Sequence, residues 1–135
     1  MIQVELSKII IDEKRQDQII VLKEKDGQRQ FPIVIGFLEA SSIKMKLSGM
    51  NPPRPMTHDL LMSVIEGLNA TLHELVIDRL EKSTFHAKLI LKTKNSRKKS
   101  IDARPSDGVA MAVRAGAPIF VDEAVLDKAT LFEEQ

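Results

Sequence analysis

The sequence predicts a single α+β domain, in which a mixed, largely antiparallel sheet carries three to four helices. Two observations lead to this fold class. Short segments rich in Val, Ile and Leu, several of which alternate apolar and polar residues, occur in both halves of the chain, as expected of strands with one buried face. Segments with helical spacing of apolar residues separate them, and 135 residues with 43% hydrophobic composition suit one compact core better than two.

The first third of the chain predicts a three-strand meander. An Asp-Gly pair at 26–27 is typical of the tight turn of a hairpin, and apolar runs flank it on both sides. The expected strands are Val4 to Ile11, Gln18 to Glu24 and Phe31 to Ile35.

Two helices separated by a rigid loop are expected next. The first runs from Phe37 to Leu47, and Asn51 to Met56 forms the loop, because each of its prolines removes an amide donor. Thr57 is expected to cap the second helix. The predicted buried faces are Leu38, Ala40, Ile43 and Leu47 in the first helix, and Leu60, Leu61, Val64, Ile65 and Leu68 in the second.

The second half of the chain predicts a long antiparallel pair followed by shorter elements. Proline is tolerated in a first helical turn and glycine commonly ends a helix, which places one helix between Pro105 and Gly116. The other expected elements are strands at Thr71 to Leu80, Thr84 to Lys94, Lys99 to Ala103 and Pro118 to Val121, then a short helix and a frayed acidic tail to Gln135.

Composition narrows the classes of function. The chain has no cysteine, which excludes disulfides and thiolate metal sites and leaves His, Asp and Glu as metal ligands. Its apolar runs are too short to cross a bilayer, and residues 1–5 lack a secretory pattern, so we expect a cytoplasmic protein with no membrane partner. A net charge of +1 and five aromatic residues, all Phe, indicate that any nucleic-acid contact is local and made mainly to phosphate.

An Arg-Pro pair precedes a predicted helix twice, each time with an aspartate in the first turn of that helix. The pairs are Arg54-Pro55, followed by Asp59, and Arg104-Pro105, followed by Asp107. Unpaired amides at a helix N-terminus bind anions, and an adjacent arginine can add a bidentate contact to phosphate. The alternative is capping, in which the aspartates satisfy those amides and each arginine pairs with a neighbouring carboxylate such as Glu39 or Asp102.

Acid–base and metal chemistry have candidates in the same segments. His58 lies beside Asp59, and an imidazole titrates near neutrality, so His58 is the candidate to move a proton. A structural histidine bonded to a loop carbonyl is the alternative. Four carboxylates form a possible set for one or two Mg²⁺ or Mn²⁺ ions: Glu39, Asp59, Asp102 and Asp107.

A basic stretch without an acid follows the predicted long hairpin. Its positive charges are Lys92, Lys94, Arg97, Lys98 and Lys99. Such a cluster can attract phosphate backbones, and a plain solvated turn is the alternative.

An ordered series of motifs resembles the bifunctional nuclease (BFN) domain family between Gly36 and Val121. The motifs are Gly36 with Glu39-Ala40, Arg54 to Leu60, Phe85-His86-Ala87, Ile101 to Asp107, and Ala117 to Val121. The resemblance implies an α+β domain that is usually a homo-oligomer. It also implies activity on both RNA and DNA, as reported for plant relatives.

These observations lead to a hypothesis of metal-assisted phosphodiester hydrolysis of RNA and DNA with low sequence specificity. In it His58, Asp59 and Asp107 are catalytic, and no organic cofactor is expected. Nucleic acid would be held by Arg54, Arg104, Lys98 and Lys99. Two alternatives remain: a non-catalytic module that binds an anion, nucleic acid or protein, and a set of structural ion pairs at an oligomer interface.

Overall fold

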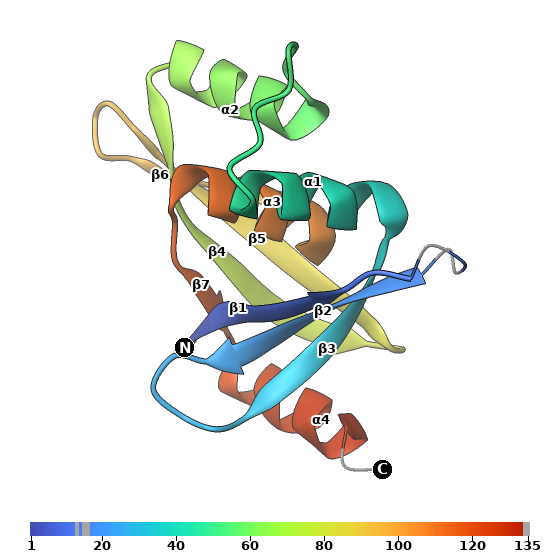
Figure 1. Cartoon of the computed structure of the whole chain (residues 1–135). Coiled ribbons are helices and arrows are strands. Elements are labelled where there is room, and N and C mark those ends of the chain that lie inside the picture. Colours follow the sequence, from blue (N-terminus) through green and yellow to red (C-terminus); the bar gives the residue numbers. More distant parts are fainter. Residues whose placement is uncertain (13, 15–16, 134–135) are drawn as a thin grey trace.

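The computed structural model describes residues 1–12, 14 and 17–133. Within these ranges the chain forms a seven-stranded mixed sheet with four helices, which confirms the α+β class (Figure 1). The elements are β1 (Ile2–Ile10), β2 (Asp17–Glu24), β3 (Gln30–Gly36), α1 (Phe37–Leu47), α2 (Thr57–Gly67), β4 (Ala70–Glu81), β5 (Thr84–Thr93), β6 (Lys98–Ala103), α3 (Pro105–Ala115), β7 (Ile119–Val121) and α4 (Glu123–Glu133).

The sheet joins the predicted meander to the predicted long hairpin. Its strand order is β3-β2-β1-β7-β4-β5-β6. The meander β1–β3 and the series β4–β6 are antiparallel, as expected from their alternating residues. The short strand β7 lies between the two halves, antiparallel to β1 and parallel to β4. This central position of β7 was not predicted.

The sheet curls so that strands distant in its order face each other. The rings of Phe31 on β3 and Phe85 on β5 have centroids 5.5 Å apart across the interior. Helix α3 is largely buried, with Val109 to Ala112 all inaccessible to solvent or nearly so. Figure 1 places α1, α2 and α3 at one end of the sheet and α4 at the other. The core is therefore enclosed by one curved sheet and capped at both ends.

Two of the predicted helix faces were only partly correct. Helix α1 buries Ala40, Ser42 and Ile43, while Leu38 and Leu47 are exposed. Ala40 and Ser42 are small, which suits the face on which α1 packs against α3. Apolar periodicity alone had placed the larger residues, Leu38 and Leu47, on the buried face.

In α2 the predicted face points outward. His58 is its one buried residue, and Ile65 is partly buried against the core. The remaining members of the predicted face, Leu60, Leu61, Val64 and Leu68, are all exposed. The N-cap is Met56, and Thr57 is the first helical residue. The main packing contacts of α2 are with α3 and β4, and the side of the helix that carries these exposed apolar residues faces solvent.

The C-terminal helix is present as predicted, and the acidic tail lies outside the described residues at 134–135. Across the described ranges, no helix combines the length and apolar composition required to span a membrane.

Helix α3 approaches the sheet closely at Gly108. A methyl group built on Gly108 would lie 2.5 Å from Cδ1 of Leu75, which is fully buried on β4. Such a contact is shorter than carbon atoms tolerate, and a buried leucine has little room to move. The absence of a side chain at Gly108 thus sets how deeply the first turn of α3 lies against β4.

We expect Gly108→Ala to destabilise the protein by about 1 to 3 kcal/mol, because overpacking outweighs the gain in helix propensity. Gly67→Ala is the matched control, since a methyl there meets no atom within 4 Å. That control is expected to leave stability unchanged or raise it by up to about 1 kcal/mol. Urea unfolding of the three proteins measures the difference, and equal stabilities of the two variants would contradict the packing argument.

Candidate functional site

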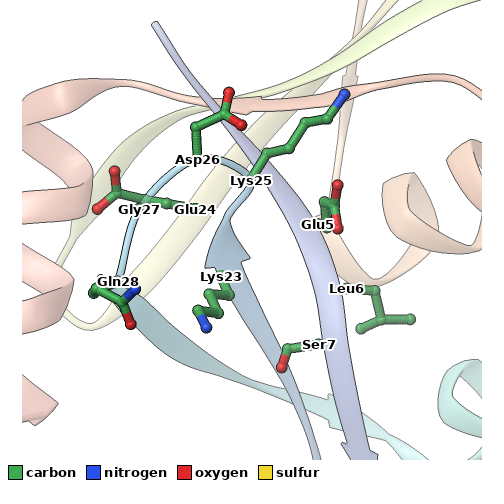
Figure 2. Close-up of a pocket in the computed structure, with 9 residues that line it drawn as sticks. All are labelled: Glu5, Leu6, Ser7, Lys23, Glu24, Lys25, Asp26, Gly27 and Gln28. Atoms are coloured by element: carbon green, nitrogen blue, oxygen red, sulfur yellow. The ribbon is translucent and has the colours of Figure 1, made fainter.

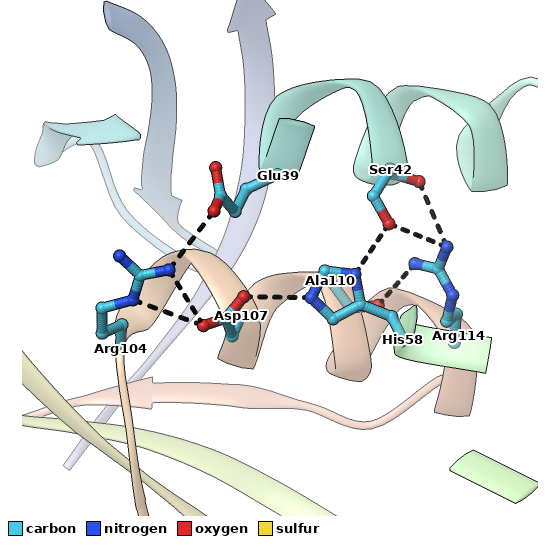
Figure 3. A network of polar contacts seen from close by, with 7 residues as sticks. All are labelled: Glu39, Ser42, His58, Arg104, Asp107, Ala110 and Arg114. Carbon is cyan, nitrogen blue, oxygen red and sulfur yellow. Dashed lines mark hydrogen bonds and ion pairs between the residues drawn. The ribbon is translucent and has the colours of Figure 1, made fainter. Parts of the chain in front are cut away.

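Three helices contribute to one polar network at the end of the sheet that they cover (Figure 3). Helices α1 and α3 pack against each other, and the first turn of α2 adds its side chains to both. The members are Glu39 and Ser42 from α1, His58 and Asp59 from α2, Arg104 as the N-cap of α3, and Asp107 and Arg114 within α3.

His58 joins the two Arg-Pro segments. Its Nε2 atom lies 3.0 Å from Oδ1 of Asp107, and its Nδ1 atom lies 2.8 Å from Oγ of Ser42. The ring is 8% exposed, and both of its nitrogens are engaged by protein groups. The first turns of α2 and α3 therefore meet, as the hydrolytic hypothesis requires, but His58 itself faces the interior.

Arg104 and Asp107 form the solvent-facing part of the network. Nη2 of Arg104 lies 3.2 Å from Oε1 of Glu39 and 3.4 Å from Oδ2 of Asp107, and Nε also donates to Oδ2 at 3.4 Å. Nη1 has no partner among the described residues, and the side chain is 71% exposed. Two carboxylates thus orient one side of the guanidinium and leave the other open. Glu39 is one of the two carboxylates that the capping interpretation offered as partners.

Asp59 belongs to a different contact from Asp107. Its Oδ1 accepts a hydrogen bond from Nε of Arg114 at 2.7 Å, and its Oδ2 accepts one from the backbone amide of Met56 at 3.0 Å. The hydrogen bond from Arg114 is the main cause that lowers the pKa of Asp59, and the Met56 amide adds to it. Adjacent helical side chains point about 100° apart, which explains why His58 and Asp59 reach different partners. The capping interpretation is therefore correct for Asp59.

Arg114 connects all three helices, and the sequence analysis missed it. Its side chain is 6% exposed, and besides Asp59 it donates to the carbonyl of Ala110 at 3.0 Å and to Oγ of Ser42 at 2.9 Å. An arginine in the last turn of a helix is ordinarily explained by its interaction with the helix dipole. A serine within a helix does not by itself indicate a functional site. The one available indication was a charged residue inside a segment of small apolar residues.

Two predicted site residues lie outside the network. Asp102 is exposed on β6, and Arg54 is exposed in the loop before α2. Neither side chain makes a hydrogen bond or an ion pair with any residue that the structure describes. The four predicted carboxylates therefore do not converge, because Asp59 pairs with Arg114 and Asp102 remains on its strand.

Glu39 and Asp107 are the two predicted metal ligands that share a partner. The described residues contain no group of three or more His, Cys, Asp or Glu side chains that could hold a metal ion. Mg²⁺, however, often takes one or two protein carboxylates and completes its shell with water and substrate phosphate. Arg104 supplies one positive charge against the two negative charges of Glu39 and Asp107, so the trio has a net charge of −1. That donor pair and its charge fit a hydrated divalent cation.

The basic stretch surrounds the turn between β5 and β6. Lys92 pairs with Lys98 in the strand register, and Lys94, Arg97, Lys98 and Lys99 are exposed. None of these five side chains forms an ion pair with an acid of the described chain. From Lys99 the strand β6 leads directly to Arg104, a path of about 17 Å at the usual rise per residue.

Hollows also occur outside the polar network. One of about 430 Å³ adjoins the turn between β2 and β3 and is bordered by Lys23, Lys25 and Asp26 among others (Figure 2). It shares no residue with the polar network. Its lysines and carboxylates have mixed signs, so it shows no preference for an anion or a cation.

Comparison with known proteins decides the family. The family model described as the bifunctional nuclease domain matches residues 20–134. The chain belongs to the bifunctional nuclease domain family. The match extends beyond the segment from Gly36 to Val121 that carried the resemblance.

Two proteins of Mycobacterium tuberculosis are similar to this bifunctional nuclease domain over most of its length. They are named uncharacterized protein MT1877 and uncharacterized protein Rv1829, from two strains. Each is 42% identical over 123 residues, which cover 91% of this chain and 73% of the relative. The family establishes a nuclease-related domain, and the relatives' names add no activity to it.

We expect Asp59→Asn to remove a pH-dependent contribution to the stability of this bifunctional nuclease domain. The pKa of Asp59 is lower in the folded than in the unfolded chain. Its ion pair therefore stabilises fully above the ordinary pKa of aspartate, and this stabilisation is lost as the pH falls through the lowered pKa. At neutral pH we expect a loss of about 1 to 2 kcal/mol, because water screens part of the half-buried pair.

Denaturant unfolding of wild type and Asp59→Asn between pH 7 and pH 2 measures this effect. The two stability curves should converge at the acid end. Asp102→Asn, an exposed aspartate without a partner in the described chain, should follow the wild type throughout. A difference between wild type and Asp59→Asn that stays constant with pH would contradict the assignment to the ion pair.

Proposed function

We propose that this bifunctional nuclease domain hydrolyses phosphodiester bonds of RNA and DNA at the Arg104–Asp107 pair, with low sequence specificity. The observation that supports it best is the geometry of Arg104. Its Nε and Nη2 atoms are held by Asp107 and Glu39, while Nη1 has no partner in the described chain and is open to solvent. A guanidinium fixed in this way can donate to a phosphate oxygen with little further loss of freedom.

Asp107 is the proposed catalytic base. Its side chain is 36% exposed, whereas His58 is buried and has both ring nitrogens engaged. In the proposed step, a water molecule gives a proton to Asp107 and forms a bond to phosphorus. The P–O ester bond then breaks, and the leaving oxygen takes a proton from solvent. His58 therefore changes from the predicted proton carrier to a positioning residue that donates to Asp107.

Glu39 and Asp107 would hold a divalent cation, with Mg²⁺ and Mn²⁺ as the candidates. The ion would supply neutralisation of the phosphate charge. Arg104 is close enough to both carboxylates to contact the same phosphate from its open side. The net charge of −1 on these three residues would otherwise repel a phosphodiester, which supports a cation requirement.

The basic stretch, with Lys98 and Lys99 at the start of β6, would guide the nucleic acid toward Arg104. These lysines are exposed and have no acidic partner in the described chain. Their contacts would be to phosphate, which agrees with the lack of Trp and Tyr in the sequence. Arg54, exposed in the loop before α2, would add a further phosphate contact.

We expect Asp107→Asn to lower kcat at least about 100-fold on labelled RNA and DNA in Mg²⁺ or Mn²⁺, because the amide cannot accept the proton. Asp102→Asn is the matched control, since it removes the same charge five residues earlier, where the exposed carboxylate has no hydrogen bond or ion pair in the described chain. It should keep wild-type activity. Both proteins are purified in parallel, so contaminating nuclease would appear equally in each.

Equal residual cleavage by wild type, Asp107→Asn and Asp102→Asn would remove the hydrolytic proposal. Binding of nucleic acid that persists in a chelator, with no product formed, would instead support the non-catalytic alternative. That alternative has its own supporting observation, because Arg104 and Arg114 already form ion pairs within the protein.

For the basic stretch we expect the double variant Lys98→Gln, Lys99→Gln to weaken nucleic-acid binding and to reduce the salt slope of log K by about 2. Lys25→Gln, Lys82→Gln is the control, because it removes two exposed lysines from other turns and changes the net charge equally. Fluorescence anisotropy at several salt concentrations measures both slopes. The same slope in the two double variants would indicate that the stretch is a solvated turn.

We also infer that the domain forms a homo-oligomer through the outward face of α2. Leu60, Leu61, Val64 and Leu68 lie on one side of this helix and are exposed. A contiguous apolar surface of this kind is typical of a protein interface. Val64→Asp should shift light-scattering mass toward the monomer, whereas Ser63→Asp on the same helix should not. A monomeric wild type would refute the inference.

A further inference from the structure

A chain of hydrogen bonds crosses the three helices from Arg114 to Asp107. Nη2 of Arg114 lies 2.9 Å from Oγ of Ser42, and this oxygen lies 2.8 Å from Nδ1 of His58. Nε2 of the same ring lies 3.0 Å from Oδ1 of Asp107. Arg114, Ser42 and His58 are buried, and Asp107 at the end of this series of hydrogen bonds reaches solvent.

With a neutral imidazole, the chemistry of the two ends fixes the direction of every bond. A guanidinium can only donate hydrogen bonds, and a carboxylate can only accept them. Oγ of Ser42 therefore accepts a hydrogen bond from Arg114, and Asp107 accepts one from the Nε2–H group of His58. In a neutral imidazole this leaves Nδ1 without a proton, so the hydroxyl of Ser42 must donate to it. All the donors consequently point from the buried cation toward the exposed carboxylate.

The geometry points to Ser42 and Arg114 as positioning residues that hold His58 as the Nε2–H tautomer, with that N–H directed at Asp107. This inference rests on the proposed function, in which Asp107 is the base. Hydrogen bonds aligned in one direction polarise one another in a medium of low dielectric constant. The carboxylate is thus fixed from inside by His58 and from outside by Arg104.

Arg114 has a second role that the experiment must separate from the first. Its Nε binds Asp59 and so fastens α2 to α3, while its Nη2 binds Ser42. Ser42→Ala breaks the hydrogen-bond chain and leaves the ion pair in place. Asp59→Asn removes the charge from the ion pair and leaves the chain in place. The two variants therefore distinguish positioning of Asp107 from simple attachment of α2.

In steady-state cleavage assays on the full chain with Mg²⁺, we expect Ser42→Ala to lower kcat by about 10- to 100-fold, the usual effect of removing an outer partner of a site residue. Its KM should stay within about twofold of wild type, because Arg104 still binds phosphate. Asp59→Asn should keep kcat near the wild-type value at a temperature where it is folded. If Asp59→Asn lowered kcat as much as Ser42→Ala, the network would have only a structural role, and the inference would be overturned.

Long-range ¹H–¹⁵N correlation spectra of the imidazoles provide a test that needs no activity. The chain has three histidines, so single His→Gln variants assign the signals. At a pH where the ring is neutral, His58 should be a single Nε2–H tautomer. Its Nδ1 resonance should move toward that of an unbonded acceptor in Ser42→Ala and stay unchanged in Asp59→Asn.

A wild-type His58 with its proton on Nδ1, or an Nδ1 resonance unaffected by Ser42→Ala, would overturn the hydrogen-bond chain itself. If wild type cleaves no nucleic acid while the spectra match expectation, the proposed function fails and the assigned bond directions stand. The spectra and the kinetics therefore separate the two proposals.

Discussion

The arrangement of the helices depends on the burial of one guanidinium. Burying a cation as fully as Arg114 costs free energy unless its hydrogen-bond donors are satisfied. Here α1, α2 and α3 each supply an acceptor. Asp59 comes from α2, Ser42 from α1 and the carbonyl of Ala110 from α3. Shifting any of these helices would leave part of that charge unpaired. Directional bonding thereby specifies positions that apolar packing alone leaves free, most clearly for α2.

The same constraint connects stability with the chemistry proposed for the domain. His58 is the one buried residue of α2, and its ring fits between α1 and α3 because Ser42 bonds to Nδ1 and Asp107 accepts from Nε2. Arg104 lies just outside, where two carboxylates hold it at the boundary with water. Burial thus increases from Arg104 through Asp107 to His58. In the proposed function, an exposed edge supported by a buried network suits low-specificity phosphate chemistry, since the backbone is the only group that such chemistry must recognise.

Much of the fold could be predicted from local pattern. Alternating residues in β4 and β5 and the Asp-Gly turn after β2 are short-range features that depend on neighbours in sequence. The location of β7 between the two halves could not be predicted, because a strand of three residues is too short for its sequence pattern to indicate which strands pair with it. The face of α2 was misjudged for a related reason. Helical periodicity shows that a helix has an apolar side, but not whether the same chain covers it.

The candidate site, like the fold, was predicted in its local features and missed in its long-range contacts. Recurrence of Arg-Pro before a helix identified both segments that meet, and the capping alternative anticipated the pairing of Arg104 with Glu39. Asp59 and Asp107 were indistinguishable by sequence, since each is an aspartate in a first helical turn. The difference between them is made by Arg114, a long-range partner of Asp59.

The central position of β7 also has a consequence for biosynthesis. Ile2 to Val4 at the start of β1 pair with Ile119 to Val121, so the middle of the sheet joins residues from nearly opposite ends of the chain. A ribosome delivers the meander and the long hairpin well before the strand that unites them. Until β7 emerges, each half-sheet has an open inner edge, and edges of this kind are where nascent chains mispair. From this topology we expect closure of the domain to be a late, high-contact-order step that follows local folding of its two halves.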